Sequence, residues 1–92
     1  MTVAFYITTF TAVDGKKVHG EILWDKHHPR QLRAYIAPYL EGNLVDYSIW
    51  EIHGGTSRPA LDILKAKLKT KAKKLGLTFV DERETEYAPK DN

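Results

Sequence analysis

The chain has 92 residues, of which 42% are hydrophobic and 28% charged, a composition typical of one globular domain rather than a disordered segment. Its 14 Lys and Arg against 12 Asp and Glu give a net charge of +2, too balanced for a histone-like tail, and the absence of cysteine excludes disulfides and thiolate metal sites. No apolar run reaches the length of a membrane span and no apolar leader opens the chain, so we expect a cytoplasmic single domain over residues 1–92, with a loose tail at 88–92 and no membrane partner.

Residues 3–24 predict a long β-hairpin, because two runs rich in β-branched and aromatic residues flank Asp14-Gly15. This dipeptide is typical of a two-residue type I′ loop. The loop fixes a register in which one face forms the core, with Phe5, Ile7, Thr11, Val13, Val18, Ile22 and Trp24. The second face is mixed, and its apolar members are Tyr6, Phe10 and Leu23.

A short helix is predicted next, from Pro29 to about Ala37, since proline suits the first helical position. Its apolar residues at helical spacing are Leu32, Tyr35, Ile36 and Leu40, with Arg30 and Arg33 pointing outward. A third strand is then predicted over Leu44–His53.

The second helix, from about Pro59 to Leu75, has the clearest pattern in the chain. Gly54-Gly55-Thr56-Ser57 precedes it and supplies a hydroxyl cap, and Gly76 suits a left-handed C-cap that lets Leu77 pack back on the helix. Its narrow apolar stripe consists of Leu61, Leu64, Leu68, Ala72 and Leu75. A fourth strand begins at Leu77 and is predicted to reach as far as Tyr87. The elements predict an α+β domain with the order β-β-α-β-α-β, in which a mainly antiparallel sheet, built on the N-terminal hairpin, is packed by two helices.

Most of the excess positive charge falls on this second helix, because residues 58–75 contain seven Lys and Arg but only one Asp. On a helical wheel the cations flank the leucine stripe on both sides. They are Arg58, Lys65, Lys67, Lys69, Lys71, Lys73 and Lys74, and Arg30 and Arg33 would extend the same surface.

Such a surface suits phosphate contact, because each ammonium group can replace a condensed counterion. Lysine is a point charge and favours the backbone over base edges. The leading interpretation is therefore a non-enzymatic binding module for DNA or RNA, without strong sequence specificity, or for an acidic protein surface. Two plainer readings stay open: the lysines only solvate the helix, or Glu82, Glu84 and Glu86 of the following strand neutralise part of their charge.

The mixed hairpin face supports a different class of function. Tyr6, Phe10 and Leu23 would be too apolar for free solvent if they were exposed. They predict a small protein-interaction or inhibitor domain, similar to phage-type accessory proteins, or a homodimer.

Catalytic signals are weak in this sequence. The four histidines are His19, His27, His28 and His53, and they form no His-x3-His pair. No nucleophile elbow, Cys–His pair or dinucleotide fingerprint is present. We predict no metal site, no cofactor and no catalytic residue.

The element order and parts of the first hairpin nevertheless resemble the GIY-YIG endonucleases. Such a resemblance implies a nuclease with a tyrosine on each hairpin strand, an arginine on the next helix and an acidic residue on the later helix. The matching positions here are Tyr6, His19, Arg30 or Arg33, and Asp62. A histidine replaces the second tyrosine and an aspartate replaces the glutamate, so the alternative is a degenerate nuclease domain of this kind.

Overall fold

The computed structural model describes residues 1–40, 43–44 and 49–90. In chain order the elements are β1 (Thr2–Thr11), β2 (Lys17–Asp25), β3 (Gln31–Leu40), β4 (Asn43–Leu44), β5 (Ile49–Gly54), α1 (Arg58–Lys74) and β6 (Thr78–Glu84). No helix within these ranges is both long and apolar enough to cross a membrane.

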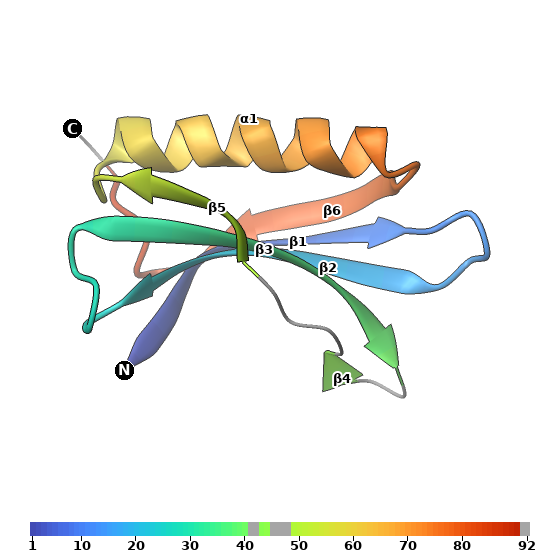
Figure 1. Cartoon of the computed structure of the whole chain (residues 1–92), viewed down its shortest axis with the longest axis horizontal. Coiled ribbons are helices and arrows are strands. Elements are labelled where there is room, and N and C mark those ends of the chain that lie inside the picture. Colours follow the sequence, from blue (N-terminus) through green and yellow to red (C-terminus); the bar gives the residue numbers. More distant parts are fainter. Residues whose placement is uncertain (41–42, 45–48, 91–92) are drawn as a thin grey trace.

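The strands of the described residues form one six-stranded sheet in which every neighbouring pair is antiparallel. Its order is β4-β3-β2-β1-β6, and β5 also pairs with β3. The chain therefore leaves β5 near one edge, crosses one face of the sheet as α1, and returns along the other edge as β6 (Figure 1). The predicted α+β class and antiparallel sheet are confirmed, but the described residues contain one helix instead of two.

The predicted first helix is wrong, because its residues form β3. Leu32 and Ala34 are both fully buried, which shows a period of two along the strand. The helical spacing that links residue 32 to residue 36 is four, an even number, so the same pair also satisfies the alternation of a strand. Pro29 lies in the turn before β3, and its carbonyl accepts a hydrogen bond from Trp24 Nε1 at 3.0 Å.

The hairpin is confirmed, but its predicted register is wrong. The loop closes through Ala12 N to Lys16 O and Gly15 N to Ala12 O, both 2.8 Å, so it holds three residues instead of two. Gly15 takes the predicted left-handed conformation, with φ +86°. The extra loop residue moves the register by one, and Phe10 now pairs with Val18.

A shift of one residue turns one strand of a hairpin over relative to the other, so Tyr6 and Phe10 now share the face of Ile22 and Val18. Tyr6 and Phe10 therefore lie under α1, with relative exposures of 0% and 2%, and not on an accessible face. Leu23 is also buried, but it is one residue away from Ile22 and so lies on the opposite face of the sheet. A second irregularity, between Ala4 and Tyr6, puts Phe5 in a bulge.

The helix α1 closes the core over the inner face of the sheet. Its buried stripe consists of Ala60, Leu61, Leu64, Leu68 and Ala72. The sequence predicts these residues except Ala60, and it wrongly adds Leu75, which is 54% exposed. The predicted C-cap is confirmed: Gly76 has φ +76° and Leu77 N donates to Ala72 O at 3.0 Å. At the other end Ser57 is the N-cap residue, but its hydroxyl makes no capping hydrogen bond.

The remaining strands differ from the prediction at their ends. The predicted strand 44–53 corresponds to β5 and the short β4, and its residues 45–48 lie outside the described part of the chain. β6 ends at Glu84 and does not reach Tyr87. Ala88, expected in a loose tail, is 7% exposed and belongs to the core cluster, so the chain remains held after β6.

Candidate functional site

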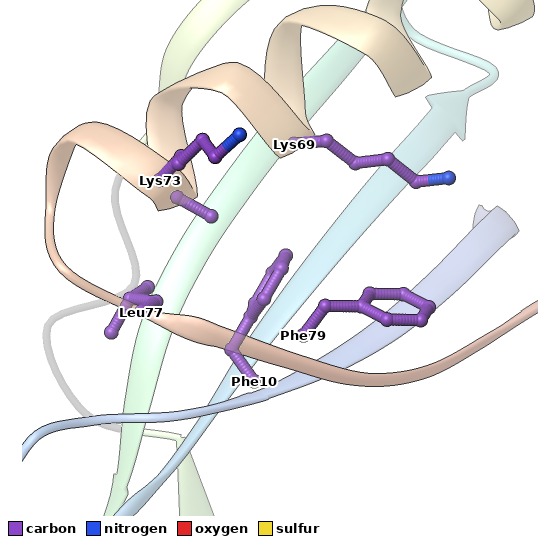
Figure 2. A pocket seen from close by; sticks show the side chains of 6 residues that line it. Phe10, Lys69, Lys73, Leu77 and Phe79 are labelled. Atoms are coloured by element: carbon purple, nitrogen blue, oxygen red, sulfur yellow. The ribbon is translucent and has the colours of Figure 1, made fainter.

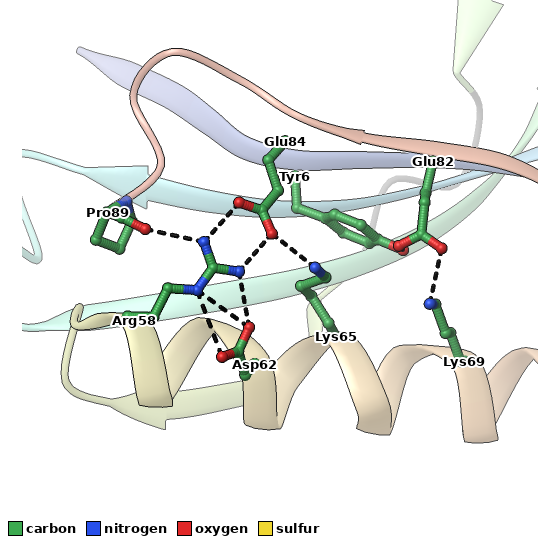
Figure 3. Close-up of polar contacts among 8 residues, drawn as sticks. All are labelled: Tyr6, Arg58, Asp62, Lys65, Lys69, Glu82, Glu84 and Pro89. Carbon is green, nitrogen blue, oxygen red and sulfur yellow. Dashed lines mark hydrogen bonds and ion pairs between the residues drawn. The ribbon is translucent and has the colours of Figure 1, made fainter. Parts of the chain in front are cut away.

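The cations of α1 divide into two groups according to what β6 places opposite them. β6 alternates, so Glu82 and Glu84 share the face of the sheet that α1 covers, since they pair with Thr8 and Tyr6 of β1. The two carboxylates thereby face the stretch of α1 between Arg58 and Lys69, with Glu84 near Arg58 and Lys65 and Glu82 near Lys69 (Figure 3).

Arg58, at the start of α1, is surrounded by acceptors. Its guanidinium donates to Asp62 Oδ1 at 2.7 Å, to Pro89 O at 2.9 Å and to both carboxylate oxygens of Glu84. Lys65 Nζ reaches the same carboxylate at 2.7 Å. The hydrogen bonds from Arg58, and then from Lys65, lower the pKa of Glu84 to about 2, so this carboxylate is ionised at neutral pH.

One turn along the helix, Lys69 is held in a similar way. Its Nζ lies 2.8 Å from Glu82 Oε2, and the hydroxyl of Tyr6 donates to Glu82 Oε1 at 3.0 Å. The hydrogen bond from Lys69 lowers the pKa of Glu82, while burial, and then the bond to Glu82, raise the pKa of Tyr6. Lys65 Nζ also lies 5.1 Å from the centre of the Tyr6 ring, a cation–π distance.

These contacts decide a question that the sequence left open. Glu82 and Glu84 do compensate the cations at 58, 65 and 69, which are therefore only partly available to an external anion. Glu86 forms no ion pair with α1 among the described residues.

The last turn of α1 is different. Lys71, Lys73 and Lys74 are exposed, and within the described residues none of them forms an ion pair. The helix carbonyls at this end favour cations through the helix dipole. The uncompensated positive charge of α1 is therefore concentrated where the helix ends.

A hollow of about 290 Å³ opens beside this cationic turn, between α1 and β6 (Figure 2). Its lining is mainly apolar, with two lysines, and consists of Phe10, Lys69, Ala72, Lys73, Leu77 and Phe79. We call it the C-terminal pocket. Sequence reasoning missed it, because the pocket depends on which residues of β6 face the helix.

Phe79 gives the C-terminal pocket an accessible aromatic wall. Its side chain is 48% exposed, whereas Phe10 beside it is buried. The two rings meet edge to face, with centroids 6.3 Å apart and an interplanar angle of 69°. Lys69 Nζ lies 5.5 Å from the centre of the Phe79 ring, so a cation, an open ring and the last turn of α1 adjoin each other.

The structure does not bring Arg30 and Arg33 to this surface. Arg30 lies in the turn before β3, and its carbonyl accepts a hydrogen bond from Gly55 N at 2.7 Å, near the start of α1. Arg33 alternates with the buried Leu32 and Ala34 and therefore faces away from the helix. The basic footprint is thus smaller than the sequence predicts.

The residues that resemble a nuclease centre are separated. Tyr6 faces α1, but His19 pairs with Thr9 and lies on the other face of the sheet, where burial lowers its pKa. Asp62 is engaged by Arg58. In the described ranges no cluster of three or more His, Asp or Glu residues could hold a metal ion.

Comparisons with protein-family models, with curated proteins and with solved structures find no match, so the functional argument depends on the geometry alone.

Proposed function

We propose that this protein is a small non-enzymatic binding module that contacts the sugar–phosphate backbone of nucleic acid, without strong sequence specificity, through the C-terminal half of α1. Lys71, Lys73 and Lys74 carry the contact, and Lys67 extends it. Arg58, Lys65 and Lys69 contribute less, because Glu84 compensates the first two and Glu82 compensates the third.

The observation that supports this proposal best is the unequal compensation of the helix. Lys71, Lys73 and Lys74 have no ion pair among the described residues and stand close together on the last turn. Each ammonium group that contacts a phosphate releases a condensed counterion. Isolated surface lysines would contribute little, but a cluster of one sign raises the local concentration of an anionic partner.

An interaction or inhibitor domain is the weaker proposal. It depended on Tyr6, Phe10 and Leu23 as an accessible apolar face, and all three are buried. An acidic protein surface remains a competitor for the same lysines, and it is best treated as an outcome of the test.

The test is fluorescence anisotropy with a labelled oligonucleotide of mixed sequence, titrated between 50 and 200 mM salt. Wild-type protein should bind at low salt and lose affinity steeply as salt rises. The variant K71Q/K73Q/K74Q should bind more weakly, with a log–log salt slope that is shallower by about 2, since each contact to a single strand contributes about 0.7.

The matched control is K26Q/R30Q/K90Q, which removes the same charge from exposed residues outside α1. Its salt slope should stay close to that of the wild type. An absence of binding at 50 mM salt, or an equal loss in the two variants, would overturn the proposal.

A further inference from the structure

We infer that the C-terminal pocket receives one unpaired base, stacked on Phe79, so that the preferred ligand is single-stranded nucleic acid. This inference rests on the proposed function and adds a ligand class to it. A base in the pocket would place its flanking phosphates over the last turn of α1, where Lys71, Lys73 and Lys74 stand.

Phe79 is exposed although two side chains contact its ring. Phe10 meets this ring edge to face, and Lys69 lies near it at cation–π distance, yet nearly half of the side chain is still accessible. An exposed aromatic ring beside cations is the kind of platform on which single-strand binding proteins stack bases.

The size of the C-terminal pocket limits the ligand. A volume of about 290 Å³ is just below the range of small-molecule sites, which extends from about 300 to 1,000 Å³. The space suits one flat ring system better than a helix or a larger ligand. Its lining is mainly apolar, so it favours the faces of a base over a bare phosphate.

The C-terminal pocket combines the two chemistries. Lys69 and Lys73 both line the pocket, and only Lys69 has a carboxylate partner in the described chain. A nucleotide joins one flat ring to one phosphate, and a strand repeats that unit along a row of lysines. A duplex keeps its bases paired and stacked inside, so only an unpaired strand can use both features.

The experiment compares three labelled probes of equal length at 100 mM salt: oligo(dT), an abasic oligomer with the same phosphates but no bases, and a mixed-sequence duplex. Wild-type protein should bind oligo(dT) about 5- to 150-fold more tightly than the abasic strand, the range that one stacked base contributes. The duplex should bind no better than the abasic strand at equal phosphate concentration.

Two kinds of variant separate the contribution of the Phe79 ring from that of the lysines. F79A should lower oligo(dT) affinity to the abasic level and leave abasic binding unchanged, while F79W should restore the preference. V80A is the matched control, because Val80 is a neighbouring exposed apolar residue of β6 that does not line the pocket. K71Q/K73Q/K74Q should weaken all three probes.

Equal affinity of wild-type protein for oligo(dT) and the abasic strand would overturn this inference and leave the proposed function standing, provided that the lysine variant still weakens both. Failure of every probe to bind, at 50 mM salt as well as at 100 mM, would overturn both proposals. Displacement of oligo(dT) by an equal concentration of a Phe-containing oligoglutamate peptide would also overturn the inference, because the pocket would then select an acidic protein segment.

Discussion

The carboxylates of Glu82 and Glu84 control how many helix cations an external anion can reach. Each accepts a hydrogen bond from one lysine of α1, at 2.8 Å for Lys69 and 2.7 Å for Lys65. We predict that E82Q/E84Q binds polyanions more tightly than the wild type, because both lysines lose an anionic partner. The amide oxygen introduced at position 82 would still accept the hydrogen bond from the Tyr6 hydroxyl, so the geometry of the core is preserved.

The magnitude follows from the number of cations released. Each additional phosphate contact on a single strand steepens the log–log salt slope by about 0.7, so two released lysines steepen it by about 1.4. Lowering the salt fourfold, from 200 to 50 mM, should then raise the affinity of the variant by about sevenfold more than that of the wild type. The three lost ion pairs, which join Arg58 and Lys65 to Glu84 and Lys69 to Glu82, are partly exposed and should cost about 0.2–1 kcal/mol each in the free energy of unfolding.

The assay is a salt series of oligonucleotide titrations, with urea unfolding to measure the cost in stability. The control E21Q/E86Q makes the same change in net charge at residues outside the ion pairs that join α1 to β6. If the control steepens the slope as much as E82Q/E84Q does, overall charge explains the effect and the local compensation argument is refuted. A fall in the affinity of E82Q/E84Q would refute it as well.

Two further predictions concern the fold. G20A should lower the free energy of unfolding by about 1–3 kcal/mol in urea titrations, because a Cβ there would lie 2.8 Å from Cγ2 of the buried Thr8. The control is G54A, whose added Cβ meets nothing within 4 Å and should change the free energy of unfolding by less than about 0.5 kcal/mol. Equal effects of the two substitutions would contradict this packing. Because Arg58 helps to lower the pKa of Glu84 to about 2 from an ordinary value of 4.5, the stability that this carboxylate contributes is complete above about pH 4.5 and is lost as the pH falls toward 2. E84Q should show a weaker pH dependence in that window, and an identical profile would show that other acids dominate.

The helix α1 was predictable because its signals agree with each other. A leucine stripe at three- and four-residue spacing, a proline in the first turn and a glycine at the C-cap all indicate the same boundaries. Residues at this spacing lie on one side of a helix, whereas a strand would place them on both of its faces. The seven cations were equally visible, since their positions on the helix follow from its period.

The segment that became β3 was not predictable in the same way. Leu32 and Ile36 fit a helix and a strand equally well, and Pro29 suits the first turn of a helix as well as a loop. Tertiary structure decides in favour of the strand, because β2, β4 and β5 all pair with β3. Pairing with strands on both sides outweighs a local helical preference.

The hairpin register depended on one residue of loop length. Gly15 takes a positive φ in a two-residue loop and in a three-residue loop alike, so the Asp-Gly signal does not distinguish them. With the three-residue loop, Tyr6 and Phe10 belong to the core and not to the predicted mixed face. The sequence pattern allowed both results, because each face of β1 contains aromatic or β-branched residues.

The charge pattern of the site depends both on the residues of α1 and on which residues of β6 face the helix. The sum of charges along α1 predicts a uniformly basic helix, but β6 pairs with β1 through a register shift between Thr9 and Phe10. On one side of that shift, Glu82 and Glu84 face the helix and compensate Lys65 and Lys69. On the other side, Phe79 faces it and opens the C-terminal pocket.

One irregularity in β6 therefore separates the ion-paired cations Arg58, Lys65 and Lys69 from the last turn of the helix, where Lys71, Lys73 and Lys74 have no ion pair among the described residues. The ion-paired cations join α1 to β6, and their charges are directed toward the sheet. The last turn presents like charges close together, which costs stability through mutual repulsion in the free protein. An anionic ligand would relieve that repulsion, and this is why the binding proposal places the contact at the last turn of α1 rather than along the whole helix.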